Sequence, residues 1–172
     1  MRRVFKAVDF ISEGAGSIAR WFGLLLILVI VYDVVARYAF HAPTVWGYEV
    51  GIALGMSLYC WGYAYTESKH GHVRVDVFYI HMSPRGRAIV DTIGGFLFFL
   101  PPIGLVVLAS WDKMMWSWGV MEKSVEGYWY PPWYPLRTMV FLGFALLLMQ
   151  GLANLSRNLY HTVKGRAYGT ES

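Results

Sequence analysis

The stretch IARWFGLLLILVIVYDVVARYAF, residues 18–40, decides the class of this protein. Between Trp21 and Tyr32 it carries no charged side chain and consists mostly of leucine, isoleucine and valine. An α-helix needs about 20 such residues to cross the hydrocarbon core of a bilayer. Backbone groups in lipid have no water partner, so a segment of this kind must be helical. We therefore expect a transmembrane helix here.

The composition of the whole chain agrees with a lipid environment. Hydrophobic residues make up 56% of the 172 residues and charged residues only 15%, whereas a soluble domain carries about 25% charged residues. The mean hydropathy is +0.41. A chain of this length normally forms one domain, and this one has too few polar residues to cover a globule. We expect a single membrane domain over residues 1–172 that contacts the bilayer and no nucleic acid. The net charge of +4 is small, and its placement along the chain matters more than its size.

Three further apolar segments are long enough to span a bilayer, at about residues 45–66, 84–117 and 135–157. The sequence thus predicts an all-α, polytopic membrane protein with four transmembrane helices. The third is longer than a bilayer requires, and prolines disturb a helix about one turn before themselves. We expect a kink at Pro101–Pro102, and a helix start at Ser83–Pro84.

Residues 1–17, MRRVFKAVDFISEGAGS, differ from the spans because apolar residues recur there at helical spacing among charged ones. This pattern predicts a short amphipathic helix at the membrane interface, bent into the first span at Gly14 and Gly16; a frayed tail is the alternative. A cleaved secretory signal fits poorly, since the apolar run begins only near Trp21 and no small-residue cleavage site follows it. We expect the first span to be uncleaved.

Lysine and arginine set the predicted orientation, because cytoplasmic connections carry an excess of both. The turn at 41–46 has neither, and the connection between the third and fourth spans is mixed. The remaining connections are basic, through Arg2, Arg3, Lys6 and Arg20, then Lys69, Arg74, Arg85 and Arg87, then Arg157, Lys164 and Arg166. Both termini, including a tail at 158–172, are therefore expected in the cytoplasm.

Tryptophan and tyrosine crowd the segment WDKMMWSWGVMEKSVEGYWYPPWYP, residues 111–135. Aromatic rings of this kind prefer the boundary between membrane and water. We expect the exit of the third helix followed by a loop on the outer surface. An aromatic platform that binds a partner protein is the alternative.

Charged residues inside spans are candidates for function because they are costly in lipid. Asp33 and Arg37 are four residues apart and can pair on one helix face. Glu49 opens the second helix, where the helix dipole favours an anion. It could also pair with Arg37 across the short connection, or relay protons.

Small and polar residues suggest contacts between helices. Gly47, Gly51 and Gly55 form a doubled G-x-x-x-G on one face of the second helix, which lets another helix approach closely. Gln150 and Asn154 share a face of the fourth span and can hydrogen-bond a neighbouring helix. Whether the partner helix of the glycines belongs to this chain is open.

The stretch ESKHGHVRVDVFYIH, residues 67–81, forms the predicted cytoplasmic connection between the second and third spans. The spacing of its apolar residues fits a strand or a short interfacial helix at about 75–81, and we favour the helix because a lone strand would leave an unpaired edge. His72 and Asp76 can tie this connection together, or act as a pH-sensitive clasp. A metal site is not expected, since His-x-His alone lacks further ligands.

Sequence signals for an enzyme are absent. There is no glycine-rich phosphate loop, no G-x-S-x-G motif and no zinc spacing of cysteine and histidine. Haem between membrane helices needs axial histidines within the spans, whereas the five histidines lie in connections, at span ends or in the tail. We expect no catalytic activity, no cofactor and no metal.

Three pieces of the sequence are informative through their order and spacing: VVARYAFHAPTVWGYEVG (34–51), HGHVRVDVFY (70–79) and PPWYPLRTMVFLGFALLLMQ (131–150). Together with four spans they resemble the small transmembrane subunit, the Q or DctQ-like subunit, of tripartite ATP-independent periplasmic (TRAP) transporters. The likeness covers about residues 20–157. Its matched positions are Arg37, Tyr38, Phe40, Pro43, Trp46, Glu49, His72 and Asp76.

The resemblance implies a role that the residues alone do not. In that family the small subunit binds the large membrane subunit, M, and braces its scaffold, while M carries substrate and cations, usually sodium, by an elevator-like movement. A periplasmic binding protein, P, delivers the substrate, often a carboxylate-bearing molecule, and no ATP is used. The resemblance thus implies a non-catalytic subunit of a symporter in the bacterial inner membrane, with no substrate site of its own.

Two other functions are weighed against this one: an autonomous small transporter or channel, and the membrane anchor of a redox enzyme. A pathway through this chain alone would need polar residues that converge near the bilayer midplane. The charged residues concerned lie towards span ends: Asp33, Arg37, Glu49 and Asp91. This placement favours an accessory subunit.

Overall fold

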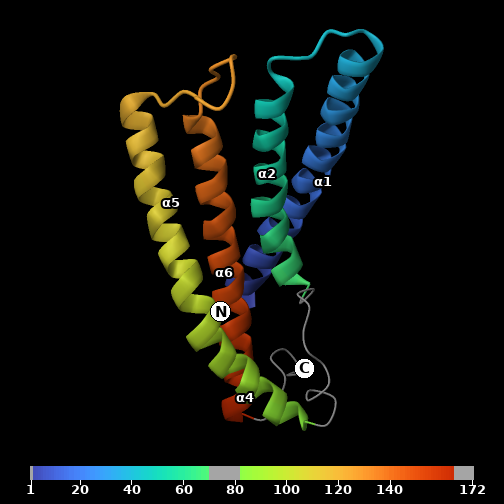
Figure 1. Ribbon diagram of the computed structural model, residues 1–172. Helices are drawn as coiled ribbons and strands as arrows, with labels where there is room; N and C mark the ends of the chain where they lie inside the picture. The colour runs from blue at the N-terminus through green and yellow to red at the C-terminus, as the bar shows by residue number, and fades with distance from the viewer. Residues whose placement is uncertain (1, 70–81, 165–172) are drawn as a thin grey trace.

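The computed structural model describes residues 2–69 and 82–164, and in these ranges the chain is helical apart from turns and one isolated β-bridge between Lys123 and Pro132. Helices α4, η1 and α5 follow one another without interruption, so the chain forms four helical rods (Figure 1). The elements are α1 (Arg2–Ala39), α2 (Gly47–Ser68), α4 (Pro84–Gly94), the π-helical turn η1 (Gly95–Phe99), α5 (Leu100–Val120) and α6 (Tyr134–Lys164).

Three of these rods are long and apolar enough to cross a membrane, over Phe5–Ala39, Ile89–Val120 and Tyr134–Tyr160. Helix α2 has 22 residues, which at about 1.5 Å per residue also matches the thickness of the hydrocarbon core. Its glycine, serine and tyrosine residues keep the hydropathy of its most apolar stretch below that of the other three rods. The all-helical fold is confirmed, and four spans with cytoplasmic termini remain a prediction.

The four rods lie side by side in the order α5, α6, α2, α1 (Figure 1). Helix α6 packs against α2 on one side and against α4 and α5 on the other, and α1 packs mainly on α2. Helices α6 and α2 are therefore the inner pair, and α1 and α5 are the outer ones. Within the apolar stretch of α6, 39% of the residues are buried, against 6% in α1 and 0% in the third rod.

Helix α1 runs without a helix break for 38 residues. The sequence prediction divides this region into an interfacial segment and a span joined by a bend, but α1 is continuous through Gly14 and Gly16. The reason for glycine at position 16 is close packing, because a Cβ there would lie 2.4 Å from the ring of Tyr65. The interfacial placement of the first turns remains a prediction.

The third rod starts where the sequence predicts. Ser83 caps α4 by accepting a hydrogen bond from the Gly86 N–H at 3.1 Å, and Pro84 occupies the first helical position. The π-helical turn η1 ends two residues before Pro101. Such a turn absorbs backbone groups that a proline leaves unpaired. A kink at Pro101–Pro102 itself remains a prediction.

Helices α6 and α2 approach each other closely at Gly143. A Cβ at Gly143 of α6 would lie 2.6 Å from the Cβ of Cys60 and 2.8 Å from its carbonyl carbon. Nearby, the Trp61 indole N–H donates to the Met139 carbonyl at 3.1 Å. Small residues at such contacts are typical of membrane helices, since they let backbones meet.

The predicted G-x-x-x-G face of α2 packs more loosely. A Cβ at Gly51 or at Gly55 would lie 4.0 Å from the side chain of Leu26 in α1, an ordinary contact distance. Gly47 instead lies against Thr44 and Asp33 at the helix start. The stripe therefore faces α1 of the same chain, while the tight contact belongs to Gly143, which the pattern did not single out.

We predict that Gly143→Ala destabilises the fold by about 1–3 kcal/mol, because the added methyl group meets backbone atoms that cannot move independently. Gly51→Ala is the matched control: it makes the same chemical change in a helix where there is room. Since both substitutions gain the same helix propensity, the difference between their melting temperatures in detergent isolates the close contact. Equal melting temperatures would contradict this account of α2–α6 packing.

Candidate functional site

A largely buried polar network joins α1, α2 and α6. Its centre is Gln150, whose side chain is fully buried. Gln150 Oε1 accepts a hydrogen bond from the Ser12 hydroxyl at 2.8 Å. Its Nε2 donates to Asp9 Oδ1 at 3.0 Å. A glutamine in the middle of α6 is thus satisfied by two residues of α1.

Asn154, one turn further along α6, extends this network to α2. Its Nδ2 donates to the backbone carbonyl and to Oε1 of Glu67, each at 2.9 Å. Arg157 closes the network by an ion pair of 2.7 Å with Asp9 and a hydrogen bond of 3.3 Å to Asn154. We call these six residues the three-helix network: Asp9, Ser12, Glu67, Gln150, Asn154 and Arg157.

The sequence analysis singled out Gln150 and Asn154 as residues able to bond a neighbouring helix, and the structure places both in this network. It did not single out Asp9 and Ser12 of α1. Their signal was present, because both are polar residues on the inward face of an otherwise amphipathic segment. Interpreting that segment as interfacial concealed their role in packing.

We predict that Gln150→Leu destabilises the protein by about 1–3 kcal/mol, because the buried Ser12 hydroxyl loses its partner in an apolar interior and Asp9 keeps only its ion pair with Arg157. Combined with Ser12→Ala, the effects should be non-additive by about 0.6–2 kcal/mol. Ser156→Ala is the control, since that exposed hydroxyl donates only to Leu152 of its own helix. Denaturation of the four variants in mixed micelles gives the coupling. Strict additivity would show that the two side chains do not interact.

A second cluster organises the connection between α1 and α2. Asp33 and Arg37 form the ion pair expected from their spacing, at 2.8 Å. The other Asp33 oxygen accepts hydrogen bonds from the hydroxyl and from the N–H of Thr44. The Thr44 hydroxyl in turn accepts from the Gly47 N–H at 3.2 Å, at the first residue of α2. Asp33 therefore fixes the start of α2 through Thr44. The sequence analysis did not single out Thr44 for this role.

A third cluster ties the loop between α5 and α6 to both helices. Glu122 accepts two hydrogen bonds from the Arg137 guanidinium, at 3.0 and 3.1 Å, and one from the Ser117 hydroxyl at 2.6 Å. The Lys113 Nζ lies 3.6 Å from Glu122 Oε1. The Arg137 hydrogen bond is the largest cause that lowers the pKa of Glu122, to about 2.

The pH dependence of this cluster follows from that shift. A lowered pKa in the folded protein means that the ionised carboxylate contributes stability above about pH 4.5, and that this contribution is lost as the pH falls towards 2. We predict that Glu122→Gln lowers the melting temperature at pH 7. The difference from the unsubstituted protein should shrink steadily between pH 4.5 and 2.5. Thermal scans in detergent across this range measure it, and a constant difference would contradict the assigned role.

Glu49 is unlike the other carboxylates. It is 1% exposed, and its two oxygens are the only buried side-chain oxygen or nitrogen atoms without a hydrogen-bond partner in the described part of the chain. The suggested pairing of Glu49 with Arg37 is wrong, because Arg37 is held by Asp33 and neither Glu49 oxygen has a partner. Gly127 of the α5–α6 loop lies directly over Glu49, where a Cβ would be 2.8 Å from Oε1.

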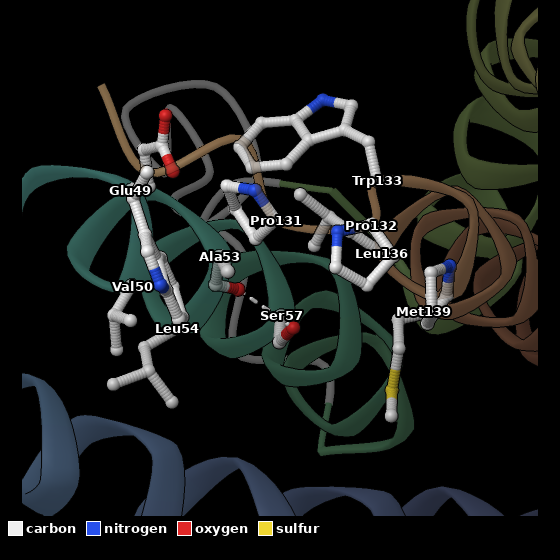
Figure 2. Close-up of a pocket in the computed structure, with 12 residues that line it drawn as sticks. Glu49, Val50, Ala53, Leu54, Ser57, Pro131, Pro132, Trp133, Leu136 and Met139 are labelled. Atoms are coloured by element: carbon white, nitrogen blue, oxygen red, sulfur yellow. Dashed lines mark hydrogen bonds between the residues drawn. The ribbon is translucent and has the colours of Figure 1, made fainter. Parts of the chain in front are cut away.

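Glu49 lines a pocket of about 360 Å³ between α2, the start of α6 and the loop before it. Figure 2 shows Glu49 at one end of this pocket and Met139 at the other, with Pro131, Pro132 and Trp133 along one wall. The second polar side chain in the lining is Ser57, which donates to the Ala53 carbonyl at 2.8 Å. The pocket is thus an apolar groove with one buried carboxylate.

The remaining candidates lie elsewhere. His72 and Asp76, with the short helix expected at about 75–81, fall outside the described residues. Within those that are described, no group of three or more histidine, cysteine, aspartate or glutamate residues could hold a metal ion. Tyr128, Trp129 and Tyr130 of the α5–α6 loop are exposed, in keeping with the expected aromatic boundary.

Comparison with known proteins gives a family match. Residues 26–160, well over half of the chain, match the family described as "Tripartite ATP-independent periplasmic transporters, DctQ component". No curated protein matches this sequence. The matched range contains α2, the π-helical turn and nearly all of α6, together with the Glu49 pocket.

Proposed function

Because this chain belongs to the DctQ family, the small membrane subunits of TRAP transporters, we propose that it binds and braces the large membrane subunit, M, of such a transporter. M performs the cation-coupled uptake, and a periplasmic protein, P, delivers the solute, which bears a carboxylate group. The assembly lies in the bacterial inner membrane, with four spans of this chain and both of its termini on the cytoplasmic side.

The observation that carries this proposal is the unequal exposure of the helices. The apolar stretches of α1 and of the third rod are 6% and 0% buried within the chain. Large side chains such as Ile27, Phe98 and Leu108 are 61%, 79% and 63% exposed on them. Lipid covers such faces, and so does another membrane protein. A row of four helices therefore offers broad apolar faces to a larger partner.

The polar interior supports bracing rather than transport. The three-helix network satisfies its buried groups by bonds between helices, and Asp33 and Glu122 are each bound by a neighbouring arginine. Residues engaged in this way fix helices relative to one another. A solute path would need polar groups that can exchange partners near the midplane.

The first experiment is reconstitution. We expect this chain to co-purify with M when the two are expressed together, and solute uptake in proteoliposomes to require both. Liposomes with M alone provide the control, supplied with the same P protein and the same cation gradient. Full uptake by M alone would contradict the bracing role, and flux through this chain alone would favour the autonomous-transporter alternative.

Photo-crosslinking locates the contact. We predict that a benzoylphenylalanine placed at position 27, 98 or 108 crosslinks to M from at least one of the two outer rods. Position 147 is the matched control, because Leu147 of α6 is only 5% exposed. Crosslinks to M from 147 but from none of the outer positions would contradict the proposed face, even if the complex itself forms.

A further inference from the structure

The Glu49 pocket combines three properties that bear on a ligand. The carboxylate at its end is buried and unpaired. Its walls are apolar over a length of helix α2 from Glu49 to Ser57, which is about 12 Å at 1.5 Å per residue. Two tryptophans, Trp129 and Trp133, belong to the lining.

An isolated carboxylate in apolar surroundings is unfavourable unless a donor or a cation accompanies it. The dipole of α2 favours Glu49 in its first turn, by about 0.3–1 kcal/mol, which is small beside the cost of an unpaired buried charge. Two arginines at this end of the fold bind other acids: Arg37 binds Asp33, and Arg137 binds Glu122. The group that complements Glu49 therefore comes from outside the described chain.

Ammonium groups match this lining well. An ammonium N–H donates a strong, charge-assisted hydrogen bond to a carboxylate, and a cation over the face of a tryptophan is further stabilised. The rest of the groove accepts hydrocarbon, because its walls are formed by Val50, Leu54, Met139 and prolines of the loop. The complementary ligand thus has a cationic head and an apolar stem.

We propose that this pocket binds a phospholipid with a primary ammonium headgroup, of the phosphatidylethanolamine class. The ammonium group lies at Glu49, and the start of an acyl chain lies along α2 and α6 towards Met139. The exposed aromatic residues of the adjoining loop, Tyr128 and Tyr130, place the mouth of the pocket at headgroup level. This inference rests on the membrane location of the chain and does not depend on the bracing role.

Competition in native mass spectrometry tests this proposal on the purified chain in detergent. Equimolar phosphatidylethanolamine and phosphatidylglycerol are offered, and we expect retention of the former to exceed that of the latter by about fivefold or more. Glu49→Gln should abolish this preference. Glu126→Gln is the matched control, because this carboxylate is exposed in the α5–α6 loop. This substitution should leave the preference unchanged.

A second variant keeps the test informative if Glu49→Gln folds poorly. Ala53→Leu fills the groove while Glu49 remains, and should reduce retention of phosphatidylethanolamine to the level of phosphatidylglycerol. A third lipid, phosphatidylcholine, has no N–H to donate and should bind less than phosphatidylethanolamine.

Three results would overturn the proposal. The first is equal retention of all lipids by the unsubstituted chain. The second is an undiminished preference in Glu49→Gln. The third is a crosslink from position 53 to a basic segment of the M subunit with no lipid preference in the isolated chain, which would make a partner side chain the occupant.

Discussion

The side chains of Gln150 and Asn154 join three helices that lipid alone would not hold together. Apolar side chains gain little by leaving lipid for each other, so membrane helices associate through close packing and hydrogen bonds. Gln150 meets Ser12 and Asp9 of α1, and its neighbour Asn154 meets Glu67 of α2. Each of these side chains is bonded to a polar group of a different helix. Separating the helices would therefore leave unpaired groups in an apolar medium, which fixes their relative positions.

The central place of α6 follows from this network together with its glycines. Gly143 lies against the backbone of Cys60, and Gly151 lies against the ring of Phe99, where a Cβ would be only 2.0 Å away. One helix thus carries small residues towards α2 on one side and towards the third rod on the other. The inner helices α2 and α6 pack against each other, and the outer faces of α1 and α5 remain for lipid or for a partner. Such a division suits a subunit that enlarges the surface of a larger membrane protein.

Features that depend on one segment at a time could be predicted from the sequence. Apolar length gave the helices, Ser83 and Pro84 gave the start of the third rod, and the spacing of Asp33 and Arg37 gave their ion pair. Features that depend on two distant segments could not be predicted in the same way. The G-x-x-x-G pattern marked Gly51, yet the tight contact is at Gly143, because close approach depends on what lies opposite a glycine. Asp9 was interpreted as part of a surface helix, since its partner Arg157 lies 148 residues away.

Glu49 is a buried carboxylate that the described part of the chain does not pair. At the end where the three-helix network lies, the buried polar groups are paired within the protein. At the other end, Asp33 and Glu122 have their own arginines, but the Glu49 carboxylate beneath Gly127 has no partner. A helix dipole offsets only a small part of the cost of such burial. In the lipid proposal the balance comes from a phospholipid ammonium group, at the depth that the exposed Tyr128 and Tyr130 of the adjoining loop indicate. One end of the fold thus pairs its buried polar groups within the chain, whereas the other end has a buried carboxylate that we propose a membrane lipid completes.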